Sequence, residues 1–258
     1  MTYIITIERK LLNVKINNHY FAMKGSEYKS NAQVVAHSHA TVPSKSLGAL
    51  ETIHINLRKE KDSLLKEMHR TTRSQIRRAE ERELRHIIIE NPTDQDLNDF
   101  KKFYNLFAKN KQTNTCNSFH IKTMKLLREQ KGLMLSYIQN DQKDIICYRV
   151  YITDGNIAMN LYSASHFRMT DNPDVKRLLS HAIRLLIWKD IIWLKECNHQ
   201  LYDMGGLTKN ENIRRFKLGF GGEIVSVYSG YEANSIVGSF ILKLRGWKMA
   251  LTTARQIQ

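Results

Sequence analysis

The sequence predicts an α/β protein built on a mixed β-sheet. From residue 84 onward, strand-like segments alternate with amphipathic helices in the order β-α-α-β-β-β-α-β-α-β. Three of the strands, at 133–139, 144–153 and 156–165, are separated only by short turns, which predicts an antiparallel meander. A short β-rich portion precedes this unit, and a long basic helix joins the two.

The first 83 residues predict short strands followed by one helix. Segments 2–8, 12–16 and 51–57 are rich in β-branched residues, and 42–48 has the composition of a loop. Residues 61–83 then carry apolar side chains on one helical face. The opposite side carries a basic stripe, which is Lys66, Arg70, Arg73 and Arg77. The stripe is either a phosphate-binding surface or an ordinary solvated face.

The remaining elements follow from local start and stop signals. A strand at 84–90 ends before Pro92, and Thr93 or Asp94 caps the next helix. A second helix, 119–130, ends at Gly132. Pro173 opens a long apolar helix, because proline is favoured in the first turn. We expect four parts: 1–60 β-rich, 61–83 helical, 84–235 catalytic, and 236–258 a basic amphipathic helix.

The charge balance indicates an anionic partner. There are 40 Lys and Arg against 25 Asp and Glu, so the formal net charge is +15. Such a field attracts nucleic acid, anionic membrane surfaces or phosphorylated substrates, although a basic surface also serves solubility alone. Three widely spaced cysteines and the lack of a signal-peptide pattern predict a cytoplasmic protein with reduced thiols. Histidine spacing predicts no metal site.

Half of the glycines gather around one short segment. Six of the 12 lie between residues 205 and 230, next to Asp203, Arg214, Arg215 and Lys217. We expect Gly205 and Gly206 to turn the chain after a strand and to leave backbone N–H groups open to a cleft. Ligands of open sheets collect beyond such strand ends. The alternative is two ordinary turns around a helix.

The element order resembles the GNAT acyltransferase fold, and three stretches narrow the resemblance. "LLKEMHRTTRSQIRRAEER" (64–82) is similar to the Arg-rich helix of the FemABX family, the aminoacyl-tRNA-dependent peptidoglycan-bridge transferases. The segment 161–188, "LYSASHFRMTDNP…", resembles that family's strand, loop and helix around the donor site. "LYDMGG…RRFKLGFGGEIVSVY" (201–228) resembles its closing motif. Together they cover most of residues 60–232.

The resemblance implies roles for individual residues. Lys217 would stabilise negative charge on the donor carbonyl, and Asp203 would orient Lys217 or accept the amine proton. The donor would lie against a larger set, which is Phe216, Arg215, Arg214, Gly205, Gly206, Tyr162, Ser165 and Arg168. Arg70, Arg73, Arg77 and Lys66 would hold phosphates of the acceptor or of tRNA.

Two departures from the family shape the functional expectation. Only one GNAT-like unit fits the chain, so residues 1–60 are at most a reduced remnant of a first unit. The donor loop, "SHFRMTDNP", lacks the glycine turn that holds the pyrophosphate of CoA. We therefore expect aminoacyl-tRNA or acyl carrier protein as donor, ahead of acyl-CoA, and no permanently bound cofactor.

The predicted function is amide formation on an amino group of a cell-envelope glycan precursor, either peptidoglycan or a surface polysaccharide. An acetyl-CoA-dependent N-acetyltransferase is the enzymatic alternative. A non-catalytic basic module that binds tRNA or anionic lipid is the other. The C-terminal helix, with Trp247 beside cations, either packs on the domain, which we favour, or contacts the inner membrane surface.

Overall fold

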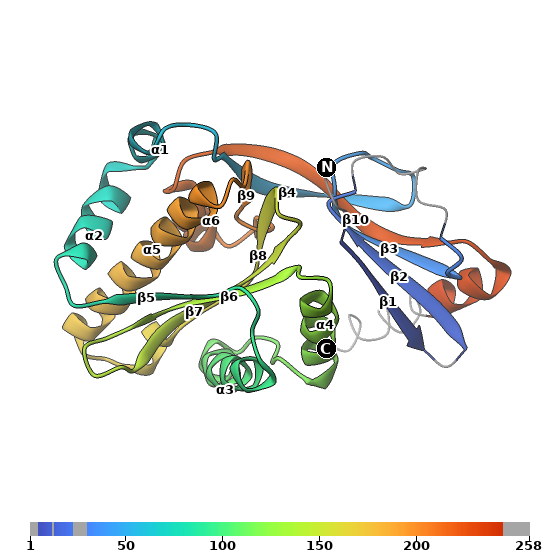
Figure 1. The fold of residues 1–258 in the computed structure, drawn as a ribbon, viewed down its shortest axis with the longest axis horizontal. Helices are drawn as coiled ribbons and strands as arrows, with labels where there is room; N and C mark the ends of the chain where they lie inside the picture. Colours follow the sequence, from blue (N-terminus) through green and yellow to red (C-terminus); the bar gives the residue numbers. More distant parts are fainter. Residues whose placement is uncertain (1–4, 12, 23–29, 245–258) are drawn as a thin grey trace. The chain divides into compact units, whose positions relative to one another are not determined.

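The computed structural model describes residues 5–11, 13–22 and 30–244 (Figure 1). The chain divides into two compact units. Of the described residues, those in 52–225 form the larger unit, and those in 5–51 and 226–244 form the smaller one. Two strands, β4 (Leu47–Asn56) and β10 (Glu223–Ala233), run from one unit into the other.

The larger unit is built on a mixed sheet. Its strands lie in the order β4-β9-β8-β7-β6-β5. The β8·β9 pair is parallel, and the other neighbouring pairs are antiparallel. Strands β5 to β9 are Arg85–Ile89, Leu133–Gln139, Ile145–Thr153, Ile157–Ser165 and Leu201–Asp203. The predicted meander is therefore confirmed as β6, β7 and β8.

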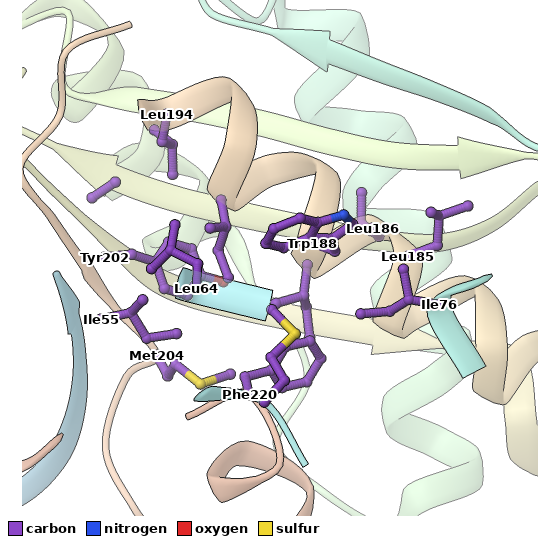
Figure 2. Close-up of a cluster of buried hydrophobic side chains, with 14 of the residues drawn as sticks. Ile55, Leu64, Ile76, Leu185, Leu186, Trp188, Leu194, Tyr202, Met204 and Phe220 are labelled. Atoms are coloured by element: carbon purple, nitrogen blue, oxygen red, sulfur yellow. The ribbon is translucent and has the colours of Figure 1, made fainter. Parts of the chain in front are cut away.

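Helices cover both faces of this sheet. Helices α3 (Asp94–Lys111) and α4 (Ser118–Glu129) pack on one face, and α5 (Pro173–Glu196) packs on the other (Figure 1). Thr93 caps α3 through a reciprocal bond with Asp96, as its sequence predicts. An apolar cluster that includes Leu186, Trp188 and Phe220 lies on the side of the sheet that α5 covers (Figure 2). The element order predicted from residue 84 is confirmed.

The single helix predicted for 61–83 is wrong. The segment forms two helices, α1 (Lys61–Glu67) and α2 (Arg70–Glu80), because Met68 and His69 adopt extended backbone. The break is held by long-range bonds that the sequence does not reveal. The N–H of His69 donates to the carbonyl of Gly219, 2.9 Å away. Helix α2 packs against α5, burying Ile76 and Ala79.

The smaller unit is a sheet with the order β1-β2-β3-β10. Its first three strands are Ile5–Leu11, Val14–Tyr20 and Val34–Ala40. The sequence analysis missed β3, whose alternating histidines hide its buried valines and alanines. Residues 236–244 are helical after β10. The rest of the predicted C-terminal helix, with Trp247, lies outside the described residues.

Among the residues that the structure describes, no helix is both long enough and apolar enough to cross a membrane. The division into two units neither supports nor opposes the idea that residues 1–60 are a remnant of a GNAT unit, which stays a prediction.

Candidate functional site

The parallel strands β8 and β9 separate soon after they pair. Their register covers only three positions, from Ile157 opposite Leu201 to Met159 opposite Asp203. Strand β8 then continues to Ser165, whereas the chain turns away after Asp203. A cavity of about 200 Å³ lies beyond the point of separation. We call this cavity the Lys217 pocket.

The walls of the Lys217 pocket combine positive charge, hydroxyl and amide groups, and apolar surface. Its cations come from three elements, α3, β7 and α6. The apolar walls are Phe107, Met204, Ile213 and Phe216. The charged and polar lining residues are Lys111, Arg149, Lys217, Asn160, Ser163 and Ser165.

Lys217 holds the glycine turn in place. Its ammonium donates to three successive backbone carbonyls, those of Met204 at 2.9 Å, Gly205 at 2.8 Å and Gly206 at 2.9 Å. An ammonium has three N–H donors, so all of them are used. The side chain reaches the turn because α6 (Glu211–Leu218) begins soon after it and places Lys217 in its last turn.

The surroundings of Lys217 make its charged form costly. Burial lowers the pKa of Lys217 to about 8, with a further contribution from the charge of Arg149 and a smaller one from Lys111. The carboxylate of Asp203 opposes this shift. Lys217 is therefore a cation at neutral pH, but one that loses its proton at much lower pH than an exposed lysine.

Asp203 organises the same turn from the other side. Its carboxylate accepts the hydroxyl of Thr52 and the N–H of Gly205, at 2.8 Å for the latter, and lies 3.4 Å from Nε2 of His54. The expectation that the glycine N–H groups face an open cleft is thus wrong for Gly205. The turn presents its carbonyls to Lys217 instead.

Gly205 is required at its position. Its φ is +73°, and a Cβ built there would lie 2.6 Å from the carbonyl oxygen of Asn160 on β8. The close approach of the turn to β8 therefore needs a residue without a side chain. The glycine cluster serves packing and turn geometry as well as the pocket.

Helix α6 separates two hollows. Ile213, Phe216 and Lys217 face the Lys217 pocket, as residues three and four apart on a helix share a face. Arg214 and Arg215 instead line a larger cavity of about 520 Å³ between α2 and α6, which Phe216 also borders. We call this cavity the α2–α6 hollow. The guanidinium of Arg184 lies 4.8 Å from the Phe216 ring centroid.

Three residues predicted to contact the donor lie in different surroundings. Ser165 lines the Lys217 pocket, and its hydroxyl is buried without a hydrogen-bond partner. Tyr162 packs on the α3 side, with ring centroids 5.5 Å from Phe100 and 5.1 Å from Tyr104. Arg168 is exposed on the short 3-10 helix His166–Met169, where its charge adds to burial in lowering the pKa of Lys111.

Three residues of the basic stripe line a separate surface hollow. Arg70, Arg73 and Arg77 line a hollow of about 330 Å³ on α2, which we call the arginine hollow. Arg73 also donates to the carbonyls of Leu65, Lys66 and Met68, so it ties α2 to the end of α1. The Lys66 side chain belongs to α1 and does not line this hollow.

Of the four charged and amide side chains that line the pocket, three were not predicted from the sequence: Arg149, Asn160 and Lys111. Arg149 sits in the middle of β7 and is 2% exposed. An arginine within the otherwise apolar run "IICYRVYI" is the signal that would have found it, because buried arginines are rare. Lys111 ends α3, and its position near the pocket depends on tertiary packing.

Comparison with known proteins identifies the fold. No protein-family model and no curated protein matches the sequence. FemX matches at a TM-score of 0.61 and 12% identity, over 87% of this chain and 83% of FemX. The C-terminal domain of a candidate lysylphosphatidylglycerol synthetase from Agrobacterium fabrum matches at 0.54 and 14%, over 93% and 83% of the two chains.

A third solved structure, L-PGS from Bacillus licheniformis, matches at a TM-score of 0.51 and 12% identity, over 82% of this chain and 72% of that one. The chain therefore has the fold of FemX, which confirms the FemABX/GNAT-like fold that the sequence predicted. Identities this low establish the fold alone.

Proposed function

We propose that this protein is an aminoacyl- or acyltransferase that forms an amide on an amino group of a cell-envelope glycan precursor. The observation that carries the proposal is the Lys217 ammonium, fixed by three carbonyls in a small pocket where two parallel strands separate. The fold is shared with FemX and with L-PGS, which supports a transferase with an aminoacyl donor.

The proposed reaction is attack of an acceptor amine on the carbonyl carbon of a donor ester or thioester. A C–N bond forms and the carbonyl oxygen becomes negative in the tetrahedral intermediate. The C–O or C–S bond to the donor carrier then breaks, and the proton lost by the amine passes to the leaving group. Lys217 supplies fixed positive charge near the developing oxyanion, which is the kind of preorganised field that lowers such barriers.

The same field assists the nucleophile. Only the neutral amine attacks, and nearby cations and burial disfavour an ammonium ion. The lowered pKa of Lys217, about 8, shows the direction of this effect inside the pocket. An acceptor amine that enters the pocket therefore loses its proton more readily than in water.

The geometry of the donor loop supports a donor other than CoA. The N–H groups of Asp174 and Val175 at the start of α5 are already bonded to the side chain of Asn172. A pyrophosphate at this helix end would have to displace that cap and lie near the carboxylates of Asp171 and Asp174. We therefore propose aminoacyl-tRNA or acyl carrier protein as donor. A saturable, micromolar calorimetric isotherm with acetyl-CoA would argue against this choice.

The arginine hollow supports an anionic partner. Three arginines around one concave surface suit the phosphates of a nucleotide- or lipid-linked precursor, or of tRNA. Contact with the cytoplasmic membrane surface would follow if the precursor is lipid-linked.

The test is mass spectrometry of glycan precursors from cells with and without this protein. The proposal predicts a precursor whose mass falls by one acyl or aminoacyl group when the protein is absent. Identical precursor masses in both strains would instead favour a non-catalytic role for the basic surfaces.

A further inference from the structure

Arg149 is a buried cation that has no anionic partner at bonding distance. It is 2% exposed, and its Nε is buried without a hydrogen-bond acceptor. No hydrogen bond or ion pair joins its guanidinium to any residue that the structure describes. Its neighbours are the rings of Tyr151 and Tyr202, whose centroids lie 5.3 and 5.9 Å away.

The nearby acid is committed elsewhere. Asp190 acts on Arg149 electrostatically, but its oxygens accept from His86 Nε2 at 2.8 Å, from the hydroxyl of Ser136 at 2.8 Å and from the hydroxyl of Tyr151 at 2.5 Å. A buried charge without a bonded counter-ion costs stability, and an apolar side chain of similar size would remove that cost. Cation–π contact with the rings of Tyr151 and Tyr202 offsets only part of that cost, so the guanidinium requires another explanation than packing.

The position of Arg149 supplies one. It lies opposite Ser163 in the β7·β8 register and forms part of the wall of the Lys217 pocket. Three lining side chains of this pocket are cationic and none is acidic. One further lining atom, Oγ of Ser165, is buried without a partner and can donate a hydrogen bond. The pocket thus offers a hydroxyl donor together with the N–H donors of the guanidinium.

We propose that Arg149 binds an oxyanion, either a carboxylate or a phosphate, on the part of the substrate that enters the Lys217 pocket. A guanidinium fork matches the geometry of both groups. The cavity, about 200 Å³, holds one group of a larger substrate. The inference deepens the proposed function, because it takes this pocket as the transfer site. Substrates whose pocket-bound group is a cation, such as a lysyl side chain, are then disfavoured.

The test measures binding and stability without turnover, so it can fail independently of the proposed reaction. Thermal melting of the full chain is followed against sodium acetate, inorganic phosphate and methylammonium chloride at constant ionic strength. We expect a saturable rise in melting temperature with acetate or phosphate, and none with methylammonium. The anion that gives the larger rise in melting temperature identifies the substrate group as a carboxylate or a phosphate. Equal responses to all three salts would overturn the proposal.

Two variants locate the effect. Arg149→Met should melt at or above the wild-type temperature without added anion, and should weaken anion binding by at least about tenfold, or 1.4 kcal/mol. Arg85→Met removes the same charge from an exposed position on β5 and should retain the anion response. If Arg149→Met does not fold, Arg149→Lys carries the test, since it keeps the charge and loses the fork.

An unchanged anion response in either Arg149 variant would overturn the proposal. So would an Arg149→Met protein that melts well below wild type yet binds anions as wild type does, because Arg149 would then serve packing alone.

Discussion

The ammonium of Lys217 lies 2.8 Å from the carbonyl oxygen of Gly205, and the N–H of Gly205 lies 2.8 Å from the carboxylate of Asp203. One glycine thus links the two charged residues through its own peptide groups. Each holds the turn from its own side, so the position of the cation depends on the conformation of the turn.

Removing the Lys217 side chain should cost stability. Lys217→Ala leaves three carbonyls without their donor, two of them on the buried residues Met204 and Gly205. A buried group left unsatisfied costs about 1–3 kcal/mol, partly offset because the cost of burying the ammonium disappears. We expect the melting temperature to fall by several degrees. Lys209→Ala, at an exposed position of the preceding loop, is the control. Equal melting of the two variants would mean that Lys217 does not hold the turn.

Turnover should depend on pH through Lys217. Burial, Arg149 and Lys111 depress its pKa to about 8, so its positive charge is nearly complete well below pH 8 and is lost as the pH rises through that value. If the charge stabilises the oxyanion, kcat should decline above about pH 8. Lys217→Arg should lower kcat but remove the decline, because a guanidinium does not titrate in this range. A wild-type kcat that does not decline above pH 8, or a decline that persists in Lys217→Arg, would contradict this role for the Lys217 charge.

Gly205 provides a test of the turn itself. Gly205→Ala combines a φ of +73° with a Cβ 2.6 Å from the Asn160 carbonyl oxygen, whereas Gly155 has a φ of +82° with no atom within 4 Å. Gly155→Ala should therefore cost only the backbone strain, about 1–2 kcal/mol. Gly205→Ala should cost clearly more in denaturant unfolding and should also impair transfer. Similar unfolding free energies for the two variants would show that β8 moves away from the new Cβ at Asn160 at little cost in free energy.

The arginine hollow should contribute to affinity and not to folding. The double variant Arg70→Glu, Arg77→Glu should weaken binding of tRNA or of an anionic precursor and reduce the salt dependence of binding, by about 0.7–0.9 in the logarithmic slope per lost phosphate contact. Arg73 is left unchanged because it bonds the end of α1. Arg85→Glu, Lys122→Glu reverses two exposed charges on β5 and α4 as a control. Equal salt slopes in the two double variants would show that the basic stripe binds no phosphate and is an ordinary solvated face.

Much of the larger unit was predictable because its signals are local. The meander follows from turns and alternating strands, and Thr93 and Pro173 mark helix starts that the structure confirms. The break at Met68 and His69 was not predictable, since the N–H of His69 bonds to Gly219, far along the chain. Strand β3 was missed because its pattern mixes histidines with small residues.

The candidate site was likewise predictable from the sequence only in part. The glycine cluster and the resemblance of residues 201–228 to the family's closing motif predicted Lys217 and Asp203 as site residues. The structure brings both to one turn. The packing of distant elements determines the remaining features of the site. These features are the direction of the carbonyls, the burial of Arg149 and the approach of Lys111 from α3. No spacing within the sequence reports these contacts.

The most direct measurement is transfer by the Lys217→Ala protein. Once the acyl group and the acceptor are known from precursor masses, turnover of purified Lys217→Ala is compared with that of Lys209→Ala on the same substrates. The experiment is run at a temperature where both are folded. We predict a loss of at least about 100-fold for Lys217→Ala, equivalent to about 2.7 kcal/mol of transition-state stabilisation, and wild-type turnover for Lys209→Ala. Turnover by folded Lys217→Ala within a few-fold of wild type would show that Lys217 is not catalytic and that the turn is a structural feature only.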